Sequence, residues 1–543
     1  FLFKFIKMKK LKLVCVAIAM AGAAPTFAGG LLTNTNQHVA FNRMMSREAS
    51  IGIDGVYYNP AGVVFMGEGH HLAINWQLAY QTRTINNDYK LFTNNVNNPI
   101  TPRDFKGKAF APVIPSFQYA YNKGKWSFQA NFALTGGGGK CTFDDGLGSF
   151  EKIVSETAIA ACGLAGVVDQ TLGNTLGQQG MEMFTSDQAF GKTGKYSFNS
   201  YMHGRQYYYG LSAGAAYKFC DNFSAFLGVR GVYALTNYYG YVENINVGNM
   251  PLYKVLDPTK ENAANIELSC DQTGVGFTPI IGVDYKTGRW NFSAKYEFKT
   301  RIRLKNKSVN QTPSIGNLPA NLANQMTGIL TAKYQQAGLP LEQAKQQAEN
   351  TTNTVLSDPK VGATMMGLKT QFDQKLNKAI GEYEDGKKIA GDIPGYLALG
   401  IGYSPVDAVR VNVGFHWFDD KNATSYNNRN KELKRGTLEY NAGVEVDVNK
   451  KITLSTGWQN TNYGLSDEYM DDKSFVVSSN SAAIGGVYHI NKKMDLNVAY
   501  FHTFYQHKKT SETVQLAADK SIVYNSDYTR NNNVFAVGLD INF

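Results

Sequence analysis

Charged residues are scarce in this chain of 543 residues: 18% are Asp, Glu, Lys or Arg, against about 25% in ordinary globular proteins. Long apolar runs are also lacking beyond the N-terminus, which excludes a bundle of membrane-spanning helices. With 43% hydrophobic residues, the chain is nevertheless too apolar to be disordered. Aromatic residues and glycine are plentiful, with Tyr 32, Phe 31, Trp 5 and Gly 53. This mixture favours strands and turns.

Five lysines open the chain, and an apolar stretch over residues 13–24 follows them. Small residues then lead to Thr26-Phe27-Ala28. This order predicts a signal peptide over residues 1–28, cleaved before Gly29. Its removal takes five Lys and no acidic residue, which lowers the net charge from +10 to +5. The remaining charge is scattered through polar loops, so no binding to nucleic acid is expected.

Apolar residues recur at every second position through most of the chain, which is the period of a strand. Residues 72–80 place large apolar side chains on one face and small or polar ones on the other. Residues 117–121 and 126–134 repeat this pattern around Asn122-Lys123-Gly124, which indicates a hairpin. Further hairpins are expected around turns at 220–222, 286–288, 405–408, 449–451 and 491–493, and a last strand over about 533–543. The pattern predicts about fourteen strands.

Tight turns and long connections alternate along the chain. The long ones are expected at about 83–112, 136–206, 237–274, 305–392, 419–436, 461–480 and 506–532. This asymmetry is typical of a bacterial outer-membrane barrel, and the last strand ends on the aromatic Phe543, as in such barrels. We therefore predict an all-β fold, a transmembrane antiparallel β-barrel over residues 69–543, in the outer membrane. A soluble β-sandwich is the alternative, but it does not explain why the loop lengths alternate.

Residues 29–68 do not alternate. A segment before the first strand starts on the periplasmic side, and its length is sufficient to fold back into the lumen of such a barrel. Gly, Asn-Pro and paired Tyr residues between positions 50 and 62 favour defined turns. We predict that this segment is an N-terminal hatch that plugs the lumen. A disordered periplasmic tail is the alternative.

The mature chain resembles the FadL-type outer-membrane transport family of long-chain fatty acid and aromatic hydrocarbon transporters. This family is described as a fourteen-stranded barrel with an N-terminal hatch that carries an Asn-Pro-Ala motif, which matches Asn59, Pro60 and Ala61. The position of the tripeptide, between a signal peptide and the first strand, makes the match specific. The hairpin 211–233 and the segment 273–297 also resemble family blocks.

The resemblance implies capture followed by diffusion. External loops take up a hydrophobic molecule, a pocket binds it, hatch movement opens a path, and a kinked third strand lets it leave sideways. In this chain, Gly136-Gly137-Gly138-Gly139 at the outer end of the third strand is a place where the sheet could bend or part.

The largest predicted loop, 305–392, is expected to be partly helical because its apolar residues have helical spacing. Six of them could line an apolar capture groove: Leu322, Met326, Ile329, Met365, Leu368 and Phe372. They could equally pack against one another and only cap the barrel.

A fatty acid needs a cationic partner for its carboxylate. Fatty-acid members of the family place basic residues where the fifth strand enters its loop, but this chain has Leu235-Thr236-Asn237-Tyr238 there. By alternation, Arg230 on the fifth strand and Lys299, Arg301 and Arg303 on the seventh face the lumen and are candidate partners for the charge. They could instead pair with lumen acids such as Glu297, which leaves a neutral aromatic hydrocarbon open as the cargo.

No catalytic, cofactor or metal site is predicted. Gly210-Leu211-Ser212-Ala213-Gly214 matches a nucleophile-elbow pattern, but it lies within a predicted strand rather than at a strand-to-helix turn. Cys141 and Cys162 share one predicted external loop in an oxidising compartment and could form a disulfide.

The sequence therefore predicts a transporter that takes up hydrophobic small molecules by passive diffusion, with long-chain fatty acids as the favoured cargo. Expected partners are this ligand, outer-membrane lipids with lipopolysaccharide, and the barrel-assembly machinery during insertion. The alternative is an adhesion or structural barrel whose loops bind external partners.

Overall fold

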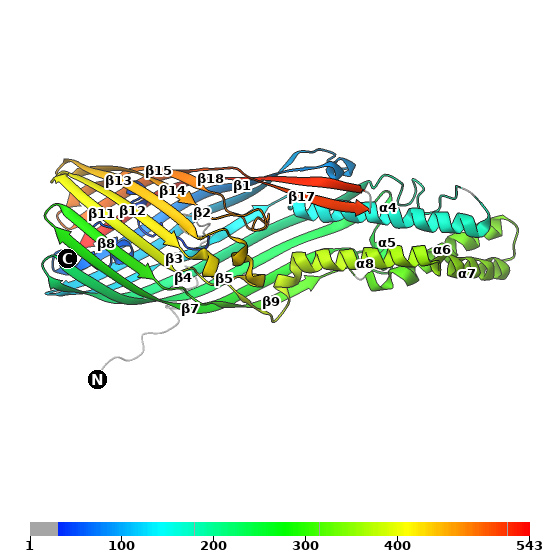
Figure 1. Ribbon diagram of the computed structural model, residues 1–543, viewed down its shortest axis with the longest axis horizontal. Helices are drawn as coiled ribbons and strands as arrows, with labels where there is room; N and C mark the ends of the chain where they lie inside the picture. The colour runs from blue at the N-terminus through cyan, green and yellow to red at the C-terminus, as the bar shows by residue number, and fades with distance from the viewer. Residues whose placement is uncertain (1–30, 179, 314, 518–519) are drawn as a thin grey trace, which may run out of the picture.

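The structure is a computed structural model that describes residues 31–178, 180–313, 315–517 and 520–543 (Figure 1). The predicted signal peptide lies outside these residues. Fourteen antiparallel strands close into a barrel, because β1 pairs with β2 on one side and with the last strand, β18, on the other. The predicted fold is confirmed.

The wall consists of β1 (Gly69–Tyr89), β2 (Arg103–Lys123), β3 (Trp126–Phe143), β4 (Tyr196–Cys220), β5 (Phe223–Val247), β7 (Ile266–Thr287), β8 (Trp290–Glu297), β11 (Tyr396–Val406), β12 (Val409–Phe418), β13 (Thr437–Asn449), β14 (Ile452–Asn462), β15 (Ser479–Asn491), β16 (Met494–Tyr505) and β18 (Lys520–Asn542). Four short strands extend the ladders beyond it: β6 (Met250–Pro251), β9 (Arg303–Gln311), β10 (Lys388–Ala390) and β17 (Lys508–Ala517). β4 and β5 have 25 residues each, far more than the ten or so that span a membrane. Much of the predicted loops 83–112 and 237–274 is therefore strand.

The outer face of the barrel is apolar all round. Each wall strand presents at least one large apolar side chain that is more than a third exposed: Trp76, Phe117, Phe128, Leu211, Leu227, Phe277, Phe292, Ile401, Val413, Tyr440, Leu454, Ile484, Val498 and Phe535. The inner face carries buried polar side chains such as Asn75, Gln118 and Asn131. A closed strand cylinder with a lipid-facing apolar band is the architecture of an outer-membrane barrel.

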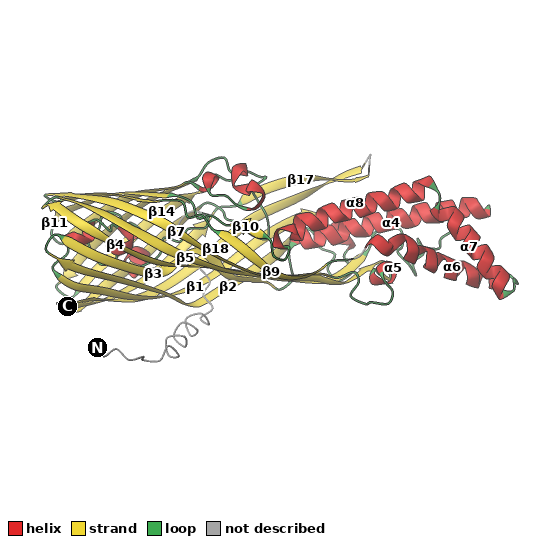
Figure 2. Ribbon diagram, turned by 90° about the horizontal axis from the view of Figure 1, so that it is seen from below, coloured by secondary structure: helices red, strands yellow, loops and turns green. Residues whose placement is uncertain are grey.

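Residues 31–68 lie inside the strand cylinder, where Figure 2 shows short helical segments. This hatch contains α2 (Val39–Met44), α3 (Gly55–Tyr58) and η1 (Gly62–Phe65). α2 packs on β13 to β16 and on β18, whereas η1 packs on β3, β4, β5 and β7. The hatch thus contacts opposite sides of the wall and occupies the lumen.

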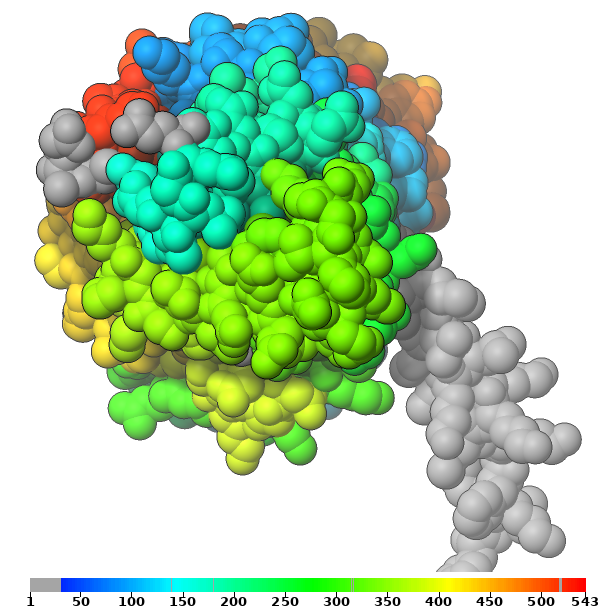
Figure 3. Space-filling model, turned by 90° about the vertical axis from the view of Figure 1, so that its right-hand side faces the viewer, coloured from blue at the N-terminus to red at the C-terminus, as the bar shows by residue number. Residues whose placement is uncertain are grey.

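A helical cap projects beyond one end of the barrel (Figures 1 and 3). Its helices are α4 (Gly148–Leu176), α5 (Tyr253–Leu256), α6 (Leu318–Gln336), α7 (Leu341–Leu356) and α8 (Pro359–Ile380). Short 3-10 turns accompany the loops: η2 (Lys90–Asn94), η3 (Ile315–Asn317), η4 (Gly381–Tyr383), η5 (Asp420–Asn422) and η6 (Tyr426–Glu432). The cap has its own apolar core, which includes Val168, Met326 and Val355.

The sequence pattern did not predict α4. Among the described helices it is the one long and apolar enough to cross a membrane, and 56% of its most apolar window is buried within the protein. It packs against α7 and α8 in the cap, so its apolar residues serve the cap core.

Candidate functional site

The tripeptide Asn59-Pro60-Ala61 ties the hatch to three wall strands. Its Asn Nδ2 donates to Asp284 Oδ2 on β7 (2.6 Å). Its Pro carbonyl accepts from Gln129 Nε2 on β3 (2.7 Å), and its Ala carbonyl accepts from Ser224 Oγ on β5 (2.8 Å). All three contacts are buried, so displacing this part of the hatch breaks three hydrogen bonds at once.

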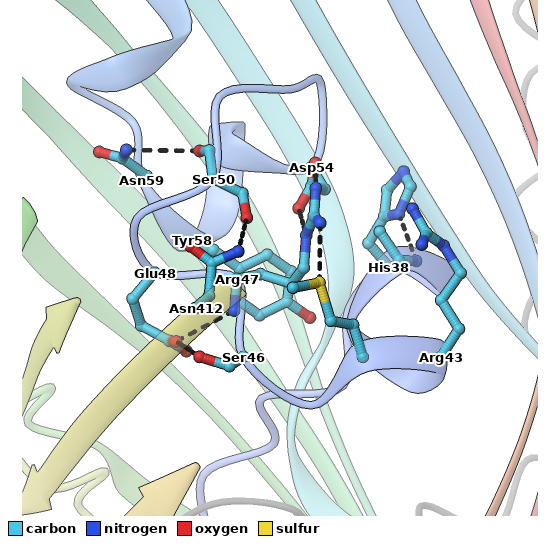
Figure 4. A network of polar contacts seen from close by, with 12 residues as sticks. His38, Arg43, Ser46, Arg47, Glu48, Ser50, Asp54, Tyr58, Asn59 and Asn412 are labelled. Carbon is cyan, nitrogen blue, oxygen red and sulfur yellow. Dashed lines mark hydrogen bonds and ion pairs between the residues drawn. The ribbon is translucent and has the colours of Figure 1, made fainter. Parts of the chain in front are cut away.

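Buried ion pairs hold the other half of the hatch (Figure 4). Arg47 forms a two-pronged pair with Asp54 within the hatch, at 2.7 and 3.0 Å. Arg43 and Arg47 both reach Glu445 on β13, which also accepts from Arg410 on β12. Because these charges are shielded from water, each one depends on its partner.

Glu48 adds a second link to the same side of the wall. His416 on β12 lies between two carboxylates, with Nε2 2.7 Å from Glu48 Oε1 and Nδ1 2.8 Å from Glu439 Oε2. All three side chains are buried. Two acceptors on one imidazole favour its doubly protonated form, which makes this a charged hatch-to-wall contact.

On the opposite side, the wall itself is interrupted. β2 and β3 pair at residues 117–123 with 126–132 and again at Gly107 and Lys108 with Phe143 and Thr142. Between these two stretches, the described residues 133–137 and 139–141 of β3 have no partner among residues 109–116 of β2. β3 bends there, since Gly137 and Gly139 have φ of 97° and 53°, a backbone that L side chains rarely adopt. We call this interruption the β2–β3 seam.

The start of the hatch fills the seam. The Asn34 N–H donates to the Thr135 carbonyl (2.9 Å), and the Gly137 N–H donates to the Leu32 carbonyl (3.0 Å). A Cβ added to Gly136 would come within 2.6 Å of that same carbonyl, so glycine permits the close approach. The hatch thus satisfies backbone groups of β3 that β2 leaves unpaired.

Three neighbouring cavities lie between the cap and this seam. The first lies between α4, α5, α6 and α8 and is lined almost wholly by apolar side chains. The second lies between α4 and strands β4, β5 and β7. The third touches Leu31 at the start of the hatch and Gly139 on β3.

Shared lining residues show that the cavities are direct neighbours. The first and second share Ile153, Val154 and Ile266. The second and third share Met202, Tyr238 and Lys473. The three cavities lie in series from the cap to the seam, and we call this series the cap-to-seam route.

Polar groups gather at the lower end of this route. Arg83 on β1 lines the third cavity, and Lys473 lines both the second and the third. Arg83 Nε and Arg530 Nη2 donate to the same oxygen, Gln81 Oε1, at 3.2 and 2.6 Å, so two guanidinium groups converge there. The strand alternation alone did not single out Arg83 and Arg530, because their strands, β1 and β18, become neighbours only when the barrel closes.

Asp472 anchors the cap helix α4 above the route. Its Oδ2 accepts from the Ser149 N–H in the first turn of α4, at 2.9 Å. Burial, together with the neighbouring Asp471 carboxylate, raises the pKa of Asp472 to about 6. In the folded protein this carboxyl therefore binds its proton more tightly than in an unfolded chain.

The region around Asp472 is expected to lose stability as pH rises, because burial and the Asp471 carboxylate disfavour the ionised carboxyl more than the Ser149 N–H favours it. The raised pKa contributes stability that is fully present below about pH 4 and lost as pH passes through about 6. We expect hydrogen-exchange protection at the start of α4 to fall by about tenfold between pH 4.5 and 7.5, after correction for intrinsic exchange. Asp472→Asn should remove this dependence, because the amide mimics the protonated acid. Equal pH dependence in the variant would contradict the assignment.

The predicted groove residues divide into three groups. Leu322, Leu368 and Phe372 line the first cavity. Met326 is fully buried in the cap core and Met365 packs against it, so they support the cavity without lining it. Ile329 is 38% exposed on the outer side of α6. The helical spacing was informative, but a helix pattern alone does not show which neighbours cover each face.

The residues predicted to bind the carboxylate of the cargo do not all lie in the lumen. Arg230 faces the lumen, where Glu297 on β8 accepts from both of its terminal nitrogens. Arg301 was expected in the lumen, and this is wrong because its side chain is exposed. Lys299 is half-buried, and its Nζ donates to the Asn422 carbonyl (3.0 Å). β8 ends at Glu297, and the alternation shifts by one residue at the exposed Phe298, which buries Thr300 and Ile302 instead.

Two further sequence expectations have clear outcomes. The Cys141–Cys162 disulfide is wrong: β3 continues through the glycines, so Cys141 lies in the wall while Cys162 lies on α4, and both thiols are free. Ser212 lies within β4, where its hydroxyl accepts from Arg230 Nε (3.1 Å).

No protein-family profile and no curated protein sequence matches the chain. Solved structures do. A FadL homologue from Pseudomonas aeruginosa matches with a TM-score of 0.57 and 13% identity, over 95% of this chain and all of that one. The toluene transporters TodX from P. putida and TbuX from Ralstonia pickettii follow at TM-scores of 0.48 and 0.44, with 12% and 13% identity, over 91% of this chain and 94% of each of theirs. The first likeness, together with the closed barrel and its internal hatch, shows that this chain has the FadL-type fold of the bacterial outer membrane.

Proposed function

We propose that this chain is a FadL-type transporter that admits hydrophobic small molecules to the cell by passive diffusion. The observation that carries the proposal is the cap-to-seam route, a series of neighbouring cavities that extends from an apolar cavity at the outer end of the protein to an interruption in the barrel wall. A molecule captured between α4, α6 and α8 moves through the second and third cavities. It leaves sideways at the β2–β3 seam when residues 32–34 withdraw. The matching structure of a FadL homologue supports this proposal.

Long-chain fatty acids fit the polarity of the route. The first cavity accepts only an apolar chain, whereas Arg83 and Lys473 at the lower end offer positive charge to a carboxylate. A neutral aromatic hydrocarbon would use only the apolar cavities.

Replacing Arg83 by Gln is expected to distinguish the two cargoes. A hydrogen bond to a charged group contributes about 1.5–3 kcal/mol, so binding of hexadecanoate should weaken by about tenfold or more. Binding of hexadecanol, which has the same chain and no charge, should change little. Both affinities are measured on the detergent-purified barrel by displacement of a fluorescent fatty acid.

Arg289→Gln serves as the matched control, because Arg289 is a half-exposed residue beside the turn between β7 and β8. If Arg83→Gln binds both ligands as the wild type does, the carboxylate assignment fails and a neutral cargo is favoured. If the wild type binds neither ligand nor toluene, the transport proposal itself fails.

A further inference from the structure

A row of cations runs along the outside of the barrel above β8. Lys299, Arg301, Arg303, Lys305 and Lys307 occupy alternate positions. The shift at Phe298 turns the last four outward, and Lys299, at its start, is half-buried. Ile302 and Leu304, between them, are buried. Along β9 the successive charges are about 7 Å apart, two strand residues at about 3.3 Å each.

The row begins where the apolar band of the wall ends. On the neighbouring strand β7, the exposed apolar side chains finish at Val275, and the next outward residues are Thr273 and Asp271. Across the ladder between β7 and β9, Thr273 lies opposite Lys305 and Asp271 lies opposite Lys307. From Trp290, the first residue of β8, the chain needs about ten residues to cross the bilayer, which brings Arg301 to its outer surface.

Positive charge exceeds negative charge along this row. Lys388 on β10 lies directly opposite Lys305, and like charges in that position are destabilising unless an anion lies between them. Arg303 pairs with Asp392 at 2.7 Å, and Lys299 reaches the same carboxylate. The other nearby acids are Asp271, opposite Lys307, and Asp385, which accepts from the Ser308 N–H. Lys305, Lys307 and Lys388 have no ion pair within the described parts of the chain.

We propose that these residues form a binding site for the phosphate groups of an outer-leaflet glycolipid, the lipopolysaccharide of the membrane. We call Lys299, Arg301, Arg303, Lys305, Lys307 and Lys388 the outer cationic row. Phosphates on a sugar head group lie at the level where the apolar band ends, and Arg and Lys side chains are the donors that bind them. The acyl chains of the same lipid would lie along the exposed Phe277 and Val275. This site is separate from the cap-to-seam route and does not depend on its function.

Native mass spectrometry of the full-length barrel in detergent tests the site, with bisphosphorylated lipid A and fully dephosphorylated lipid A as the probes. The wild type is expected to bind the phosphorylated form at least about tenfold more tightly. Arg301→Gln/Lys305→Gln/Lys307→Gln should lose this preference. These side chains are exposed, so the barrel should still fold, as heat-modifiable migration on a gel would show.

The matched control is Lys450→Gln/Lys451→Gln/Lys492→Gln, which removes three exposed charges from turns at the opposite end of the barrel. It should keep the preference. A second variant, Lys305→Gln/Lys388→Gln, removes one cross-strand pair and should show an intermediate loss. The assignment is overturned if the wild type does not distinguish the two lipids, if the row variants bind as the wild type does, or if the control loses as much. It is also overturned if a phosphate-free acidic polysaccharide binds as tightly as lipid A.

Discussion

Arg47→Met is expected to release the hatch and turn a plugged barrel into a leaky one. The substitution removes the partner of Asp54, a carboxylate that remains buried. Removing one partner of a buried ion pair costs about 3–5 kcal/mol, because the other charge stays buried without compensation. The equilibrium between the docked and the displaced hatch should therefore shift by about a hundredfold or more towards the displaced hatch. The wall strands pair with one another without Arg47, so the barrel itself should persist. Single-channel conductance in planar bilayers measures the effect, with rare or no openings in the wild type and frequent openings in the variant.

Two further variants make this result specific. Arg289→Met breaks a solvent-exposed pair with Asp407 (3.1 Å) on the turns and should leave conductance unchanged, since such pairs contribute little. Arg47→Met/Asp54→Leu removes both buried charges and should restore much of the closed state. A silent Arg47→Met channel would show that the hatch does not depend on this pair.

Ala165→Trp is expected to block capture of the cargo. Ala165 lies on α4, is 3% exposed and lines the first cavity, so an indole there fills apolar space that the cargo would use. Cargo that enters the filled cavity would overpack it, at a cost of about 1–3 kcal/mol in binding free energy. Uptake of a fluorescent fatty acid by cells should therefore slow by about tenfold. The measurement is the initial uptake rate at equal amounts of folded barrel.

Asn174→Trp is the control, because it adds the same side chain at an exposed position of the same helix. It should leave the uptake rate unchanged. Equal rates for the two variants and the wild type would mean that cargo reaches the barrel without passing through the cap.

The strand pattern was predictable because burial in a barrel has a strict period of two. Residues 72–80 alternate over their whole length, and β1 contains them in the expected orientation. The same rule failed for Arg301. One residue inserted at Phe298 reverses every later side chain, and the sequence letters continue to alternate through the insertion.

The parts of the candidate site that escaped prediction depend on contacts between distant segments. Asn59-Pro60-Ala61 could be singled out because the tripeptide is local. Arg83 and Arg530 are neighbours only because the first strand pairs with the last. The cavity beside α4 required helices from two different loops to pack together, and no local pattern specifies that packing.

Photo-crosslinking tests the cap-to-seam route most directly. A fatty acid with a diazirine near the end of its chain is added to cells, irradiated at increasing times, and the crosslinked residues are identified by mass spectrometry. We predict early crosslinks to the first cavity, at Leu322 and Phe372, followed by crosslinks at the β2–β3 seam, at Ile114 and Leu134. Crosslinks that pass instead to the hatch residues facing the periplasmic turns, such as Ile51, would contradict lateral exit, and crosslinks confined to the outer surface of the cap would contradict the route altogether.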